Sequence, residues 1–276
     1  AENLLNTVEG NISPSVAEII PSAPEEGKIA GLRLLSNRKS DAYVGTVIEQ
    51  INNASSENVR NAAYAVLKHV VSSKDLPVLY TLLENAQPDA IAPVQQAITT
   101  ALKDADKDTQ LITITGQIDK APVDKKHLYY PVLATTKHPK ALEIISSTFE
   151  KSTGSAKDAA FLALLDWEGQ EVADQLLAVC KDASASGYFE RSLNRYIQLT
   201  SNPELTGENR RLFLTNALEI AKTDGQKNEI LKNLGETNSF LSLILAGKYL
   251  DQPSVQQSAA QAVMNIALNN KSITGK

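Results

Sequence analysis

The sequence predicts an all-α fold, an α-α superhelix in which about seven helical hairpins form one solenoid. Three observations predict this fold class. Apolar residues recur with a helical period of 3.6 residues from about Glu25 to Asn269. The segments between these periodic stretches are mostly short, which forces neighbouring helices to run antiparallel. One apolar pattern is also used twice along the chain.

The composition favours packed helices over sheets. Hydrophobic residues make up 42% of the 276 residues, enough for a continuous core, whereas aromatic residues make up only 5%. Ala and Leu dominate the apolar set, and such small or unbranched side chains suit closely packed helices better than sheets. The 13 Gly and 11 Pro fall mostly between periodic stretches and divide the chain into separate helices.

The periodicity divides the chain into a lead-in segment, residues 1–24, and a single helical-repeat domain, residues 25–276. The lead-in is expected to form a short amphipathic stretch followed by a loop. The domain is expected to hold helices near residues 25–37, 41–53, 57–71, 75–86, 90–104, 107–119, 123–136, 139–151, 155–166, 169–182, 186–200, 207–222, 225–235, 239–250 and 253–269.

The clearest of these helices covers residues 57–71. Its apolar residues follow a single stripe at i, i+3, i+4, i+7, i+8 and i+11, namely Val59, Ala62, Ala63, Val66, Leu67 and Val70. Asp75 is expected to cap the start of the next helix. Ser254 and Gln257 have the spacing of a capping box before the last one.

One segment also has the alternating pattern of a strand. Apolar residues alternate with Thr between Leu111 and Thr115. Leu111, Ile114 and Ile118 nevertheless lie at helical spacing, and an isolated strand among helices would have nothing to pair with. We therefore expect a helix here.

The stripe of residues 57–71 recurs near the end of the chain without a gap. At a fixed offset, five apolar pairs match: Val59 with Val255, Ala63 with Ala259, Leu67 with Val263, Val70 with Ile266, and Val71 with Ala267. A repeated helical unit of this kind is typical of solenoid proteins. Ala63 and Ala259 are the positions where hairpins are expected to approach most closely.

Two stretches resemble a known family. Residues 58–67, NVRNAAYAVL, resemble the second helix of a HEAT repeat, an armadillo-like unit. Residues 158–267 are similar to a HEAT-like region of secreted bacterial proteins that often carry a 3-keto-disaccharide hydrolase-type domain. The resemblance implies a setting in glycan metabolism. It carries over no hydrolase activity, because no catalytic domain is visible in the chain.

Charge and hydropathy exclude two classes of partner. The formal net charge is −5 and no long basic stretch occurs, so we expect no nucleic-acid binding. No apolar window reaches the length that spans a bilayer, so we expect no membrane insertion. Met264 is the only methionine, so we expect that Ala1 is not the translated start and that either a leader was removed or the chain was trimmed. A removed leader would make the protein secreted or periplasmic; the alternative is a cytoplasmic protein.

The residues that usually carry chemistry form no recognisable motif. The histidines His69, His127 and His138 belong to no HExxH pattern, and Cys180, the only cysteine, lies in an apolar stripe. We therefore expect no catalytic residue, no metal site and no cofactor. Trp167 could be a stacking platform for a sugar or peptide, or a packing residue at the end of a hairpin.

One group of side chains has the composition of a protein-binding surface. Arg191 and Arg195 stand at i and i+4 and therefore project side by side. Together with nearby aromatic residues they form what we call the aromatic–arginine group: Tyr188, Phe189, Arg191, Arg195 and Tyr196. Tyr and Arg are enriched at binding hot spots. The alternative is a solvated face on which acidic neighbours, Glu190, Glu204 and Glu208, neutralise the arginines.

The function expected from these features is a non-enzymatic protein-interaction or scaffold solenoid. It would be the helical part of an exported bacterial protein linked to glycan metabolism, and its partner would be a protein or an adjoining domain. The alternative is an enzyme with an active cleft on the concave face, of lyase or hydrolase type.

Overall fold

The computed structural model describes residues 10–237 and 239–269. Over these residues the chain is all-helical and contains no strand, as the sequence predicts. The helices form two compact units, with the boundary between Asp166 and Trp167. The sequence alone had suggested one domain from residue 25 onward.

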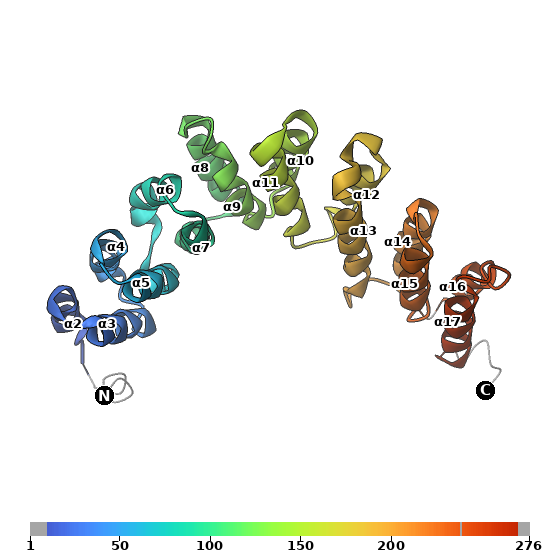
Figure 1. Cartoon of the computed structure of the whole chain (residues 1–276), viewed down its shortest axis with the longest axis horizontal. Coiled ribbons are helices and arrows are strands. Elements are labelled where there is room, and N and C mark those ends of the chain that lie inside the picture. Colours follow the sequence, from blue (N-terminus) through green and yellow to red (C-terminus); the bar gives the residue numbers. More distant parts are fainter. Residues whose placement is uncertain (1–9, 238, 270–276) are drawn as a thin grey trace. The chain divides into compact units, whose positions relative to one another are not determined.

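The first unit is built of consecutive helices that pack as pairs, such as α4 with α5 and α10 with α11 (Figure 1). Alternate helices also pack on one another, as α3 does on α5 and α5 on α7. Its described α-helices are α2 (Ser13–Ile19), α3 (Glu25–Asn37), α4 (Val44–Asn53), α5 (Glu57–Val70), α6 (Leu76–Glu84), α7 (Pro88–Leu102), α8 (Lys107–Lys120), α9 (Tyr130–Thr135), α10 (Pro139–Lys151) and α11 (Gly154–Leu165).

The second unit repeats this arrangement. Helix α12 pairs with α13, α14 with α15, and α16 with α17, while α15 also packs on α17 and α14 on α16. Its described α-helices are α12 (Ala173–Lys181), α13 (Phe189–Gln198), α14 (Gly207–Ile220), α15 (Asp224–Leu234), α16 (Phe240–Gly247) and α17 (Gln256–Asn269). Across both units, short 3-10 helices precede or follow several α-helices: η1 (Ile20–Ser22), η2 (Asp41–Tyr43), η3 (Ser73–Asp75), η4 (Lys126–Tyr129), η5 (Ala183–Tyr188) and η6 (Leu199–Ser201).

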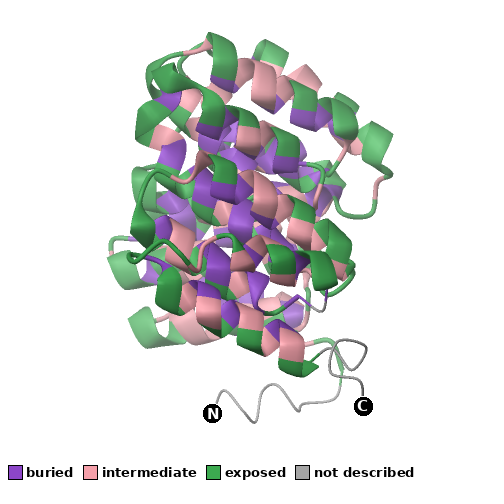
Figure 2. Cartoon of the chain, turned by 90° about the vertical axis from the view of Figure 1, so that its right-hand side faces the viewer, coloured by how far each residue is buried: buried purple, intermediate pink, exposed green. Residues whose placement is uncertain are grey.

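Burial follows the apolar stripes. In α5 the buried residues are five of the six predicted positions: Val59, Ala63, Val66, Leu67 and Val70. Charges suit the helix dipole, with Glu57 in the first turn and Lys68 in the last. Figure 2 shows the same alternation of buried and exposed residues along the other helices.

The buried positions of α5 define a register that other helices share. Residues at positions i, i+4, i+7, i+8 and i+11 are buried in α7, and again in α13 and η6 when counted from Phe189. The residues are Ala90, Val94, Ala97, Ile98 and Ala101 in the first case, and Phe189, Leu193, Tyr196, Ile197 and Thr200 in the second. The predicted copy near the chain's end has Val255, Ala259, Ala262 and Ile266 buried and Val263 half-buried.

The lead-in segment contributes to the core of the first unit. Within it, α2 and η1 are helical, and both pack on α3. Ile20 is only 1% exposed. A Cβ added to Gly31 of α3 would lie 2.6 Å from Cγ1 of Ile20, so only glycine permits this approach.

Two local details differ from, or refine, the sequence-based expectation. Asp75 does not cap α6. It closes η3 instead, where its Oδ2 accepts hydrogen bonds from the backbone N and the Oγ of Ser72, so the helical segment starts one short turn earlier. The segment with alternating Leu111 to Thr115 lies within α8, and Leu111 and Ile114 are buried there, as the helical alternative predicts.

Candidate functional site

The aromatic–arginine group does not form one exposed surface. Phe189 and Tyr196 are only 4% and 2% exposed, because both belong to the buried register of α13. Tyr188 and Arg195 are half-buried, and Arg191 is exposed. The expectation that the rings of Phe189 and Tyr196 contact a partner is therefore corrected: these two rings stabilise the second unit from within.

Each buried ring has a defined partner. The Nζ of Lys222 lies 3.6 Å from the centroid of the Phe189 ring, a cation–π contact. The Tyr196 ring stacks on Phe213 with centroids 5.1 Å apart, and its hydroxyl accepts a hydrogen bond of 3.1 Å from Nδ2 of Asn216. Burial raises the pKa of Tyr196. These contacts tie α13 to the helix that follows it.

Arg195 supports the same packing. Its Nη2 donates a hydrogen bond of 2.8 Å to the backbone oxygen of Trp167. Trp167 itself is 1% exposed, so its indole is a packing residue and offers no stacking surface. Of the two alternatives that the sequence left open for Trp167, the structure supports the second.

Cys180 and His138, two residues of types that can carry nucleophilic or acid–base chemistry, have contacts within the fold. Burial raises the pKa of the Cys180 thiol to about 12, which keeps it protonated at neutral pH. His138 uses both ring nitrogens: Nδ1 accepts from the backbone N of Lys140 at 3.0 Å, and Nε2 lies 2.9 Å from Oδ1 of Asp108. Within residues 10–237 and 239–269, no three His, Cys, Asp or Glu side chains gather to hold a metal ion.

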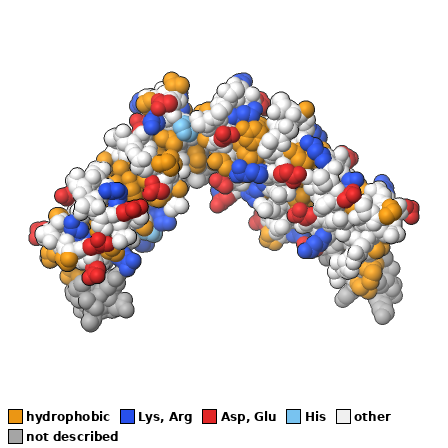
Figure 3. Space-filling model, in the orientation of Figure 1, with side chains coloured by type: hydrophobic (Ala, Val, Ile, Leu, Met, Phe, Trp, Pro, Cys, Tyr) orange, Lys and Arg blue, Asp and Glu red, His pale blue; other side chains and the backbone are white. Residues whose placement is uncertain are grey.

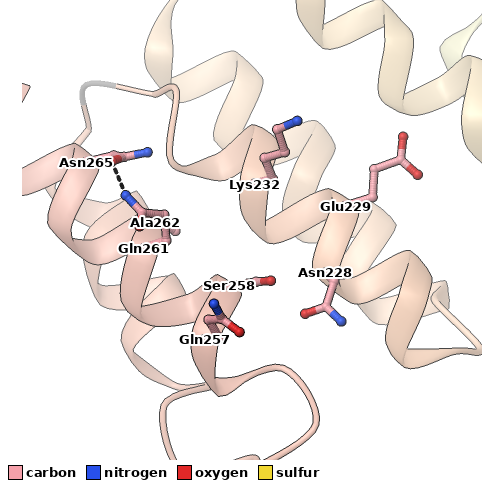
Figure 4. Close-up of a pocket in the computed structure, with 8 residues that line it drawn as sticks. All are labelled: Asn228, Glu229, Lys232, Gln257, Ser258, Gln261, Ala262 and Asn265. Atoms are coloured by element: carbon pink, nitrogen blue, oxygen red, sulfur yellow. Dashed lines mark hydrogen bonds between the residues drawn. The ribbon is translucent and has the colours of Figure 1, made fainter.

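A groove lies between α15 and α17, both in the second unit (Figure 4). Its volume is about 540 Å³. Eight residues line it, three from α15 and five from α17: Asn228, Glu229, Lys232, Gln257, Ser258, Gln261, Ala262 and Asn265. We call it the amide groove, because four of the eight are Asn or Gln.

Three amides follow one side of α17. Gln257, Gln261 and Asn265 stand at i, i+4 and i+8, so they form a row that runs along the helix at an incline to its axis. The Nε2 of Gln261 donates a hydrogen bond of 2.7 Å to Oδ1 of Asn265, which orients both side chains (Figure 4).

The opposite wall repeats the spacing on α15. Asn228 and Lys232 stand at i and i+4, and Nδ2 of Asn228 donates a hydrogen bond of 3.4 Å to the backbone oxygen of Ser254. Asn228 and Ser258 face one another across the groove in Figure 4. Both walls therefore present polar groups at one-turn intervals.

The floor of the groove is fixed by close helix packing. Ala262, 1% exposed, lies at the contact between α17 and Gly235, the C-cap of α15. Small residues at this contact let the backbones of α15 and α17 approach each other closely.

The electrostatic character of the groove is neutral. Glu229 and Lys232 contribute one charge of each sign, and the other lining residues are uncharged. On the face that Figure 3 presents, acidic and basic side chains are likewise interspersed. Such a site does not select its ligand by net charge.

A second concavity, of about 850 Å³, lies in the first unit where the loops after α3, α5 and α7 converge. Its basic side chains, Lys39, Lys68, His69 and Lys103, stand at or just beyond the C-terminal ends of these helices. Cations there stabilise the helix dipoles, and this role accounts for their positions.

The chain matches no family model and no curated protein. None of the helices in the described residues is long and apolar enough to cross a membrane.

Proposed function

We propose that the chain is a non-enzymatic protein-interaction module, a solenoid of helical hairpins of HEAT type that holds a partner in the amide groove. The observation that carries this proposal is the groove itself. It is open, neutral, and lined by amide and hydroxyl groups that can donate and accept hydrogen bonds but are poor nucleophiles.

The shared burial register supports the solenoid part of the proposal. Residues at the same five spacings are buried in α5, in α7 and across α13 and η6, and four of the five positions are buried again from Val255 onward. Successive helical pairs that bury equivalent positions against their neighbours are the unit of repeat proteins. The resemblance of residues 158–267 to a HEAT-like region of secreted bacterial proteins supports an exported protein linked to glycan metabolism.

The roles of the reactive side chains support the non-enzymatic part. The Cys180 thiol is buried and protonated, and both nitrogens of His138 hold helix α10 in place. Neither residue lines the amide groove.

A capture experiment tests the proposal. The purified chain is immobilised, exposed to an extract of the native host, and compared with an Asn228→Ala/Gln261→Ala variant that removes one amide from each wall. A partner retained by the native chain and lost by the variant is the expected result. The proposal fails if the partner list is unchanged, or if the isolated chain turns over glycosides or esters in a way that one point substitution abolishes.

A further inference from the structure

We propose that the amide groove binds an extended polypeptide segment, lying along α15 and α17, through the segment's backbone. This inference rests on the proposed function and names the kind of partner. Four features of the groove carry it: its spacing, its hydrogen-bonding groups, its charge and its lack of apolar anchors.

The spacing of the amides matches an extended chain. Residues four apart on a helix are separated by about 6 Å along its axis. An extended strand repeats its backbone orientation every two residues, about 6.6 to 6.8 Å. Gln257, Gln261 and Asn265 would thus meet every second peptide unit of a ligand running along α17. The difference of less than about 1 Å at each step is within the reach of flexible amide side chains.

The hydrogen-bonding groups complement a peptide unit. A peptide unit offers one N–H and one C=O, and an Asn or Gln amide offers the matching acceptor and donor. In the Gln261–Asn265 pair the hydrogen bond occupies Nε2 of the first and Oδ1 of the second. Oε1 of Gln261 and Nδ2 of Asn265 therefore remain as one acceptor and one donor for a ligand. If both side-chain amides were flipped by 180°, one hydrogen-bond donor and one acceptor would still remain for the ligand.

The charge of the groove disfavours nucleic acid. Lys232 is its only cation, and Glu229 lies one turn away on the same helix. A ligand that binds through phosphates needs several cations. A peptide backbone is neutral and needs no cation to bind.

The shape and chemistry of the lining also disfavour two other ligands. A bound amphipathic helix needs an apolar groove, and Ala262 is the only hydrophobic residue that lines this one. An oligosaccharide would gain most from an aromatic ring to stack on, and no lining residue is aromatic. An extended segment recognised through main-chain hydrogen bonds needs neither.

The first part of the test uses a phage-displayed library of random linear peptides, selected on the purified full chain. Enriched peptides are synthesised, and their affinity is measured by fluorescence anisotropy for the native chain and for the Gln257→Ala, Gln261→Ala and Asn265→Ala variants. Each variant is expected to bind roughly two- to tenfold more weakly, the effect of one or two lost hydrogen bonds. Gln256→Ala is the matched control, because Gln256 is an exposed amide of α17 that does not line the groove. Its affinity should be unchanged.

The second part distinguishes backbone recognition from side-chain recognition. N-methylation is scanned along the tightest peptide, one backbone nitrogen at a time. Loss of affinity at alternate positions is the expected result. A loss that repeats every three to four positions, or none that is periodic, would overturn the inference because it would indicate a helical ligand or side-chain recognition.

Other outcomes also decide the question. The inference is wrong if no peptide is enriched, if the groove variants bind as tightly as the Gln256→Ala control, or if an oligosaccharide array binds in a groove-dependent manner. If a variant loses peptide binding and also has an altered circular dichroism spectrum, Gln261→Glu decides: it keeps the shape of the side chain but removes the donor that orients Asn265 and adds a charge. It should bind peptide more weakly with an unaltered spectrum, and unchanged affinity would overturn the inference. If the host partner is captured through the groove while peptides are not, the proposed function stands and this inference falls.

Discussion

Gly235 and Ala262 are in direct contact where α15 meets α17. A Cβ added to Gly235 would lie 3.0 Å from Cα of Ala262 and 3.2 Å from the backbone oxygen of Lys232. Both neighbouring atoms belong to the main chain, so neither can move without shifting a helix. This contact sets the separation of the two walls of the amide groove.

Gly235→Ala should therefore destabilise the second unit. The added methyl group overpacks a main-chain contact, at a cost of about 1–3 kcal/mol. Urea denaturation followed by the emission of Trp167, the only tryptophan and a buried one, measures the change. Gly247→Ala is the control, because nothing lies within 4 Å of the added Cβ there. The control should be neutral or slightly stabilising; equal midpoints for the two variants would contradict the packing described.

Ala63→Leu and Ala259→Leu test the shared register. Both alanines are 0% exposed, so a larger side chain should cost about 1–3 kcal/mol of unfolding free energy at either site. Chemical denaturation monitored by circular dichroism gives the values. Ala65→Leu, an exposed position on α5, serves as the comparison and should change stability by less than about 0.5 kcal/mol. Unchanged midpoints for both core variants would mean that neither alanine lies at a close helix contact and that the register is wrong.

The two arginines of α13 should differ in what they support. Arg195→Ala removes the hydrogen bond to the Trp167 oxygen and should lower the unfolding free energy by about 1–2 kcal/mol. Arg191→Ala, at an exposed position, should change it by less than about 0.5 kcal/mol. Urea titrations of both variants, each read from Trp167 emission, make the comparison. A larger effect for Arg191 would show that the exposed guanidinium is the structural one.

Alkaline pH should weaken the second unit through Cys180. Desolvation raises the pKa of this thiol to about 12, from an ordinary value of 9.0, and the charge of Lys222 opposes the shift only in part. The unfolded chain therefore releases the proton first. The thiol's contribution to stability is intact below about pH 9 and is lost as pH rises from there toward about 12.

Two measurements check this behaviour. A thiol-specific chromogenic reagent should leave the native protein unmodified at neutral pH and react once urea unfolds it. The stability of Cys180→Ala should also fall less steeply above pH 9.0 than that of the native chain. Rapid modification of the native thiol at neutral pH would show that Cys180 is accessible.

Most helices could be predicted because their apolar stripes extend over several turns. The expected helices at residues 25–37 and 139–151 coincide with α3 and α10. Helix α2 was not predicted as a separate element, since seven residues complete fewer than two turns and Pro14 interrupts the pattern. The prediction that Asp75 caps α6 is wrong because a 3-10 helix precedes α6. A helix of three residues is too short to produce an apolar period in the sequence.

The candidate site was harder to predict, for two different reasons. Phe189, Leu193 and Tyr196 stand at i, i+4 and i+7, the spacing of a buried helical stripe. The burial of Phe189 and Tyr196 could therefore have been predicted from the sequence pattern. The amide groove is formed by two helices, and its existence depends on Gly235 packing on Ala262. The row of Gln257, Gln261 and Asn265 is visible in the sequence, but the wall opposite is not.

The pairing of helices with their near neighbours has a kinetic consequence. The principal contacts of each unit join elements that follow one another closely in the sequence, such as α4 with α5 and α16 with α17. Chains dominated by such local contacts have low contact order and fold on the microsecond to millisecond scale. Folding can begin at any adjacent pair and propagate outward, so an outermost pair such as α16 and α17 should open before the interior of its unit does. Amide hydrogen exchange would then show protection that rises from the edge of the unit inward.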